Sequence, residues 1–330
     1  MKSSLRYAIE GTTITRGRLL SLASGAAVMG ALAAPARAQT SQPVRLGVLS
    51  AESAAEAHYA QDLGYFAKAG LDVTITTMSN TPSIVAGVVA GALDIGYTTI
   101  DSVASIRAHN IPLVVIAPST DYIDPGTVDT AGVLVRKDSP IRTAKDLGGK
   151  TIAIPALHSL GTTGASAWID ANGGNSSTVK YVEIPFPTQP AALAAGRVDA
   201  IFEVEPFFGA AAKQFRVLFS GYSAISKHFL LNLWVATPDW AKAHEDIVSR
   251  FASIIHETAV WANAHHAQSG AILAKYSKIP EATIAVMARS HYAEELTPAL
   301  MQPGIDASAK YNGFPTFPAS ALLLPQNPRR

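Results

Sequence analysis

Ala90-Gly-Ala-Leu-Asp-Ile95 and Ala195-Gly-Arg-Val-Asp-Ala200 are two stretches of the same pattern, far apart in one chain. In each, a helix end is followed by a glycine that can take a positive φ, then by a turn and an aspartate that enters an apolar strand. One such junction is common wherever helices and strands alternate. Two of them in the same surroundings indicate a repeated structural unit.

The surroundings of the two junctions agree as well. The pattern predicts strands over 44–49, 73–77 and 93–97 with helices over 54–69 and 82–90, and then strands over 151–154, 179–184 and 198–202 with helices over 163–171 and 189–195. Strands that alternate with helices favour parallel sheets that are covered on both faces. We therefore expect an α/β fold of two lobes, each a mostly parallel sheet flanked by helices.

The path of the chain between the lobes follows from the turn-rich stretches. Two hinge crossovers are expected near residues 118–131 and 217–234. Lobe 1 then consists of residues 43–120 and 235–330, and lobe 2 of residues 131–225. The last third is expected to be helical, with one long helix over 239–267.

Residues 1–38 have the three-part layout of a secretory signal peptide. A basic stretch with Lys2, Arg6, Arg16 and Arg18 precedes the apolar run 19–34, and Ala36-Arg37-Ala38 has the form of a cleavage site. The apolar run is shorter than the ~20 residues that span a bilayer. We expect the leader to be removed near Ala38 and the protein to be periplasmic, with the Sec and twin-arginine routes both open.

The composition excludes several functions. The formal net charge is +1 and charged residues make up 15% of the chain, so there is no basic field to recruit nucleic acid. The chain contains no cysteine, which excludes disulfides, thiolate nucleophiles, thiolate metal sites and a cysteine-linked lipid anchor. The nine histidines lack the spacing of a metal site, and no Gly-x-Ser-x-Gly motif is present, so neither a cofactor nor catalysis is expected.

Several strings resemble the periplasmic substrate-binding proteins of ABC importers, in particular the nitrate, sulfonate, taurine and thiamine-precursor (NitT/TauT-like) group. They are Asp62-Leu-Gly-Tyr-Phe-Ala-Lys-Ala-Gly-Leu-Asp-Val73, Ala90-Gly-Ala-Leu-Asp-Ile-Gly96, Val135-Arg-Lys-Asp-Ser-Pro-Ile141, Asp146-Leu-Gly-Gly-Lys-Thr-Ile-Ala153, Ala192-Leu-Ala-Ala-Gly-Arg-Val-Asp-Ala200 and Glu205-Pro206-Phe207. The resemblance implies a type II periplasmic-binding-protein fold, a monomer that closes over a small-molecule ligand and delivers it to the membrane subunits of an ABC permease with a cytoplasmic ATPase. A fungal branch of this superfamily synthesises the thiamine pyrimidine with a cysteine-rich iron motif, which this chain lacks.

In open α/β sheets, ligands bind beyond the carboxyl ends of the strands. That rule gives candidate ligand-binding residues in both lobes: Ser50, Glu52, Ser79, Asn80, Thr81, Thr98, Thr99, Asp101, Asp121 and Tyr122 in lobe 1, and His158, Ser159, Gly161, Thr162, Thr163, Phe186, Thr188, Glu203 and Glu205 in lobe 2. The loop 158–164 is the most informative, since a helix start can bind carboxylate, sulfonate or phosphate. An ordinary N-cap turn is the alternative there, and a hinge-holding role is the alternative for Glu205.

The expected ligand is a small organic anion or a zwitterion, similar to a sulfonate or taurine. The carboxylates among the candidate ligand-binding residues leave the choice between an anion and a zwitterion open, because two of them facing the cleft would repel a simple oxyanion. A receptor for a pyrimidine thiamine precursor or an aromatic acid is the alternative, and an enzyme of the same fold is a third reading.

Overall fold

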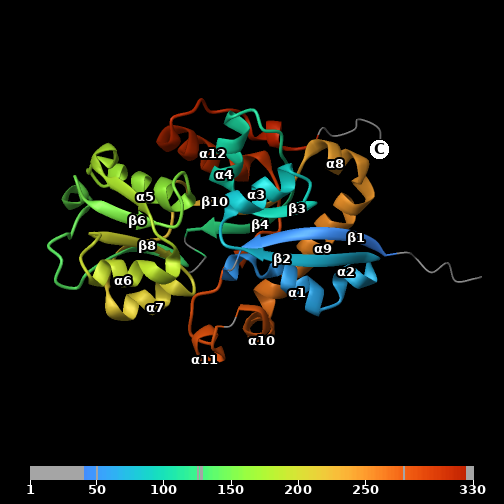
Figure 1. Ribbon diagram of the computed structural model, residues 1–330, viewed down its shortest axis with the longest axis horizontal. Helices are drawn as coiled ribbons and strands as arrows, with labels where there is room; N and C mark the ends of the chain where they lie inside the picture. The colour runs from blue at the N-terminus through green and yellow to red at the C-terminus, as the bar shows by residue number, and fades with distance from the viewer. Residues whose placement is uncertain (1–40, 50, 125, 127–128, 278, 325–330) are drawn as a thin grey trace, which may run out of the picture. The chain divides into compact units, whose positions relative to one another are not determined.

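The computed structural model describes residues 41–324 apart from 50, 125, 127–128 and 278, and they form two mixed sheets flanked by helices (Figure 1). The expected leader, residues 1–38, lies outside the described residues. Within the described ranges, no helix is long and apolar enough to cross a membrane.

The strands divide between the two sheets in a simple way. The first sheet has the order β11-β4-β10-β3-β1-β2, and the second has the order β7-β6-β8-β5-β9. The first contains β1 (Gln42–Leu49), β2 (Leu71–Met78), β3 (Ile95–Thr99), β4 (Val114–Ile123), β10 (His228–Ala236) and β11 (His291–Tyr292). The second contains β5 (Ala131–Val135), β6 (Thr151–Ile154), β7 (Lys180–Glu183), β8 (Ala200–Val204) and β9 (Arg216–Ser220).

Helices cover the sheets. The α-helices are α1 (Glu56–Asp62), α2 (Tyr65–Lys68), α3 (Thr81–Val89), α4 (Ile100–Ala108), α5 (Leu160–Ala171), α6 (Gln189–Ala194), α7 (Phe207–Gln214), α8 (Pro238–Ala243), α9 (Glu245–Ala264), α10 (His266–Ser277), α11 (Glu281–Ile284) and α12 (Pro298–Asn312). Short 3-10 turns are η1 (Glu52–Ala54), η2 (Ala144–Leu147), η3 (Ser176–Thr178), η4 (Phe186–Thr188) and η5 (Ala319–Leu322).

The two sheets share one topology, β2-β1-β3-β10-β4 in the first and β7-β6-β8-β5-β9 in the second. In each, the first three strands pair in parallel, and the next strand in the order is antiparallel to both of its neighbours. That strand, β10 or β5, is the one that enters from the other sheet, so the antiparallel pairs mark the crossovers. The predicted α/β class, two sheets flanked by helices, is confirmed. The junction glycines Gly91 and Gly196 have φ of 71° and 67°, as the repeated pattern requires.

The repeated aspartate has the same function in both sheets. The carboxylate of Asp94 accepts a hydrogen bond from the backbone N–H of Arg45 at 2.7 Å, and the N–H of Asp94 donates to the carbonyl of Arg45 at 2.8 Å. Asp199 forms the same pair of bonds with Thr151, at 2.9 Å each. Each aspartate therefore ties the start of its own strand, β3 or β8, to the adjacent strand, β1 or β6. The tie lies where the backbone hydrogen bonds between the two strands end.

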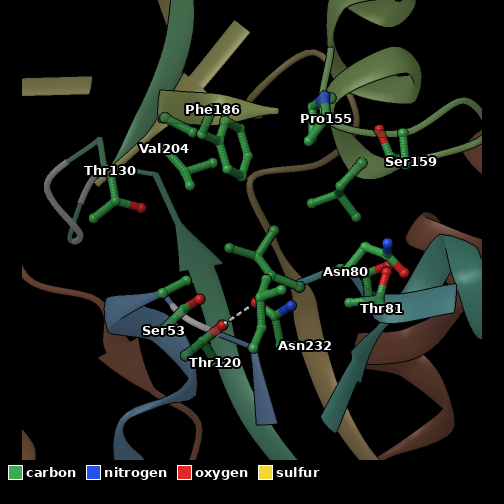
Figure 2. Close-up of a pocket in the computed structure, with 18 of the residues that line it drawn as sticks. Ser53, Asn80, Thr81, Thr120, Thr130, Pro155, Ser159, Phe186, Val204 and Asn232 are labelled. Carbon is green, nitrogen blue, oxygen red and sulfur yellow. Dashed lines mark hydrogen bonds between the residues drawn. The ribbon is translucent and has the colours of Figure 1, made fainter. Parts of the chain in front are cut away.

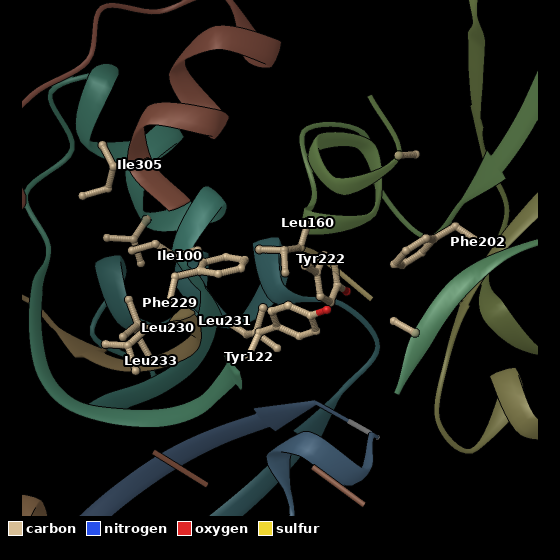
Figure 3. Packing of buried hydrophobic residues seen from close by; sticks show 14 of the residues in the cluster. Ile100, Tyr122, Leu160, Phe202, Tyr222, Phe229, Leu230, Leu231, Leu233 and Ile305 are labelled. Carbon is tan, nitrogen blue, oxygen red and sulfur yellow. The ribbon is translucent and has the colours of Figure 1, made fainter. Parts of the chain in front are cut away.

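One hydrophobic cluster runs across the region where the sheets meet. It includes Ile100 of α4, Leu160 of α5, Phe202 of β8 and Phe229 of β10, with Tyr222 between β9 and β10 (Figure 3). The chain crosses between the sheets twice, between Ile123 and Ala131 and between Ser220 and His228. Helix α12 contacts both α4 and α5, so it also joins the two halves.

Candidate functional site

A pocket of about 820 Å³, measured with its open mouth, lies where the carboxyl ends of strands from both sheets come together. Figure 2 shows its walls, with Ser53 and Thr120 on one side and Phe186, Pro155 and Ser159 on the other. The lining residues are Leu49, Ala51, Ser53, Ser79, Asn80, Thr81, Tyr97, Thr99, Thr120, Thr130, Ala131, Pro155, Ala156, Ser159, Leu160, Gly161, Phe186, Phe202, Val204, Tyr222, Leu231, Asn232 and Ser290. A mostly apolar lining with a few polar groups is typical of small-molecule sites.

Three helices begin at this pocket. Their N-cap residues, Asn80 of α3, Thr99 of α4 and Ser159 of α5, all line it. The first N–H groups of a helix have no intrahelical partner, and together they carry a partial positive charge. The Asn80 side chain satisfies one such donor, the N–H of Ser83, at 2.8 Å. Among the described residues, the side chain of Ser159 makes no capping bond and its Oγ is buried without a hydrogen-bond partner, so this side chain leaves the first N–H groups of α5 uncapped.

The described wall of the pocket carries no carboxylate, no basic side chain and no histidine. Its polar groups are hydroxyls and two carboxamides, Asn80 and Asn232, and its apolar part includes the rings of Phe186, Phe202 and Tyr222. Partial charges and ring faces therefore replace full charges around the ligand position. Such a wall suits a molecule with one polar or anionic group and an apolar body.

Two predicted acids lie outside the pocket wall and are buried. Burial raises the pKa of Asp101 to about 7, although hydrogen bonds from the Thr99 hydroxyl and the first N–H groups of α4 oppose the rise. Burial raises the pKa of Glu203 to about 9, and neither oxygen of this carboxyl group has a hydrogen-bond partner among the described residues. At neutral pH the Glu203 side chain is therefore uncharged. These acids do not present carboxylates to the cavity, so the repulsion of an oxyanion that the sequence left open has no source in the described wall.

The structure brings part of the predicted set together at the pocket. Ser79, Asn80, Thr81 and Thr99 reach it from the first sheet, and Ser159, Gly161 and Phe186 reach it from the second. Ser50 lies outside the described residues. That these residues bind the ligand stays a prediction.

The remaining candidates from the first sheet are engaged elsewhere. Glu52 is buried and pairs with Arg289 at 2.9 Å. Asp121 accepts hydrogen bonds from His228 at 3.0 Å and His291 at 2.6 Å. Thr98 and Tyr122 are buried beside the pocket without lining it.

The remaining candidates from the second sheet also lie away from the wall. His158 has a φ of 54°, and its Nδ1 lies 3.0 Å from the Oδ1 of Asn312 in a separate groove that Thr162 also lines. Thr163 is buried and Thr188 is exposed, with its hydroxyl donating to the carbonyl of Pro185 at 2.9 Å. The backbone N–H of Glu205 donates to the carbonyl of Thr130 in the first crossover at 2.8 Å, and its hinge role stays a prediction.

Sequence reasoning missed several lining residues. Thr120 and Asn232 come from the strands next to the crossovers, Ser290 from the segment before β11, and Phe202 and Tyr222 from the second half. For Asn232 a signal was present, because it is the one polar residue within the apolar run 229–236. A buried polar side chain in a strand needs a partner or a ligand.

A two-sheet α/β chain with a pocket between the sheets has the fold of the periplasmic binding proteins. The chain belongs to the NMT1/THI5-like family, whose model matches residues 53–269, well over half of the sequence. A comparison with the curated proteins finds no match.

Solved structures agree with this placement. SsuA, the periplasmic aliphatic sulphonate binding protein of Escherichia coli, has a TM-score of 0.69 at 18% identity over 87% of this chain and 93% of that one. NrtA, the periplasmic nitrate-binding protein of Synechocystis PCC 6803, has a TM-score of 0.61 at 14% identity over 73% of this chain and 68% of that one. The desulfurization enzyme DSZB has a TM-score of 0.63 at 14% identity over 86% of this chain and 97% of that one. The predicted resemblance to the NitT/TauT-like binding proteins is confirmed.

Proposed function

We propose that this protein is a periplasmic solute receptor of an ABC import system, which binds a small organic anion or zwitterion between its two halves and delivers it to a permease. One observation carries the proposal: helix starts from both sheets meet at one pocket whose described wall has no charged side chain. N–H donors and helix dipoles favour an anionic group. The sulfonate- and nitrate-binding neighbours support an anionic ligand.

The apolar part of the wall favours a ligand with an organic body over a bare oxyanion. Phe186, Phe202 and Tyr222 offer ring faces, and Leu231 adds an aliphatic side chain. Ring faces of this kind also suit a flat ligand, which keeps an aromatic acid or a pyrimidine thiamine precursor as the second candidate.

Variants at Ser159 test the proposal. The purified protein is screened by thermal shift with ethanesulfonate, taurine, nitrate, benzoate and a hydroxymethylpyrimidine, and the ligands that stabilise it are titrated by calorimetry. Ser159→Asp and Ser159→Asn both provide good N-cap side chains, so the helix start is retained in each. We expect the aspartate to weaken binding of an anion by at least about tenfold, since its carboxylate repels the ligand, while the asparagine rescues most of the affinity. Equal affinity of the two variants for the anion would refute the assignment.

Because the enzyme DSZB shares this fold, the same samples are also used to test whether the protein is a transport receptor or an enzyme. The stabilising ligand is incubated with the protein and recovered by liquid chromatography. A receptor returns the ligand unchanged. Steady formation of product would instead make the protein an enzyme.

A further inference from the structure

Strand β10 carries a local irregularity at the pocket. Its pairing with β4 shifts register between Leu230 and Asn232 and again between Asn232 and Leu233. In a regular strand successive side chains point to opposite faces, whereas a bulge redirects one of them. Leu231 and Asn232 both line the pocket, and the bulge explains how two neighbours in sequence do so.

Thr120 fixes the carboxamide of Asn232. Its hydroxyl donates a hydrogen bond of 2.6 Å to the Asn232 Oδ1, and both side chains are buried, with residue exposures of 1% and 8% (Figure 2). A carboxamide has one carbonyl oxygen and two N–H donors. The oxygen is held by Thr120, and no described residue accepts a hydrogen bond from the Nδ2 of Asn232. Asn232 therefore presents N–H donors to a ligand.

The described wall of the pocket has few groups that could stabilise a ligand's ammonium group. Its described wall contains no carboxylate, and the hydroxyl of Tyr97 donates to Ser53 at 2.7 Å. An ammonium group buried without a counter-charge is strongly disfavoured, because neutral hydroxyl oxygens replace its hydration only in part. An anion in the same place meets Asn232 and the starts of the three helices.

We propose that Asn232, positioned by Thr120, determines specificity by admitting ligands that only accept hydrogen bonds, so that the pocket selects organic anions such as sulfonates and carboxylates over zwitterions that carry the same anionic group. The inference rests on the proposed receptor function and narrows its ligand class. Asn232 touches the ligand, and Thr120 acts through Asn232.

Two matched ligand pairs measure this selectivity: ethanesulfonate with taurine, and propionate with β-alanine. Within each pair the second ligand adds an ammonium group and changes nothing else in charge or head group. We expect the wild-type protein to bind the anion of each pair at least about tenfold more tightly. Asn232→Asp keeps the shape but replaces the N–H donors by carboxylate oxygens, so the anion-to-zwitterion affinity ratio should fall by at least about tenfold.

Variants of Thr120 test the same affinity ratio without changing Asn232. Thr120→Val removes the hydroxyl that orients the carboxamide and should lower the ratio, while Thr120→Ser restores the hydroxyl and should restore the ratio. These two variants decide the question if Asn232→Asp fails to fold, which circular dichroism reports. An unchanged ratio in Asn232→Asp and in Thr120→Val, with binding intact, overturns the inference and leaves the receptor in place. Binding of the zwitterion as tightly as the anion in the wild-type protein also overturns the inference alone. Failure of the wild-type protein to bind any ligand in the screen overturns the receptor and the inference with it.

Discussion

Arg289 and Glu52 form a buried ion pair whose removal should be the most damaging single change near the pocket. The side chains are 8% and 1% exposed, and the Arg289 Nε donates to the Glu52 Oε1 at 2.9 Å. The other carboxylate oxygen accepts from the backbone N–H of Ser290 at 3.0 Å, and the Arg289 Nη2 donates to Tyr59 at 2.7 Å. The pair therefore anchors the segment that brings Ser290 to the pocket wall.

Arg289→Met keeps the length of the aliphatic stem and removes the charge. The Glu52 carboxylate is then left buried without its counter-charge, a change that costs about 3–5 kcal/mol of unfolding free energy. In a chain of this size each kcal/mol of unfolding free energy corresponds to about 2 °C in the melting temperature. The melting temperature of Arg289→Met should therefore be lower by roughly 6–10 °C. The double variant Glu52→Gln with Arg289→Met removes the stranded charge and should recover about half of the loss or more.

Thermal unfolding followed by circular dichroism at neutral pH measures both effects. Gly148→Ala is a suitable control, because its φ of −54° suits alanine and the added Cβ would meet only ordinary contacts. The reasoning fails if Arg289→Met costs less than about 1 kcal/mol, or if the double variant melts no higher than the single one. Either result would mean that water reaches Glu52 and solvates it.

Two further predictions concern the ion pair at the end of β4 and the glycines of the repeated junctions. The hydrogen bond to Asp121 raises the pKa of His291, so the folded state binds the imidazole proton more tightly than the unfolded state does. The contribution of this proton to the free energy of unfolding is complete below about pH 6.5 and is lost as the pH rises through the raised pKa. His291→Gln should flatten that decline in urea midpoints measured between about pH 5 and pH 9, and an unchanged slope would exclude His291 as its source. Gly91→Ala and Gly196→Ala should each cost about 1–2 kcal/mol in urea unfolding, because φ is 71° and 67°, whereas a cost no larger than that of Gly148→Ala would contradict the strain argument.

The scaffold could be predicted from the sequence because its determinants are local. Each junction closes a short strand–helix–strand unit, and the Asp94 and Asp199 bonds reach only to the adjacent strand. The helix starts at Asn80 and Ser159 follow from the same units, which is why the loops 79–81 and 158–163 were predicted at the ligand site. Of the second loop, only residues 159–161 line the pocket.

The helical last third was predicted less well. One long helix was expected over 239–267, but α8, α9 and α10 replace it, with breaks at His244 and His265. Each histidine ring stacks on a tryptophan four residues earlier, Trp240 or Trp261, and its Nδ1 lies within 2.9 Å of that tryptophan's carbonyl oxygen. The rings therefore bond to the end of the preceding helix, an interaction that apolar periodicity does not reveal.

The proposed specificity of the pocket could not be predicted from the sequence, because it depends on contacts between distant parts of the chain. Asn232 meets Thr120 only because β10 returns from the second sheet and pairs beside β4, and the bulge that redirects Asn232 arises in that pairing. Hydropathy marks Asn232 as an unusual residue in its strand, but it does not say which face the side chain takes. Ser290 depends likewise on the buried pair of Glu52 and Arg289.

The repeated topology also explains how the proposed anion pocket can form without a charged side chain in its described wall. A parallel strand followed by a helix places the helix start at the carboxyl edge of its sheet, and both sheets follow this rule. When two such edges meet at one cavity, the starts of α3 and α4 from one half lie around the same space as the start of α5 from the other. Like partial charges around an empty cavity are unfavourable, and a single anion offsets all three. The proposed preference for an anion thus follows from the doubled fold, while Asn232 adds the proposed distinction between anions and zwitterions, which the fold alone does not make.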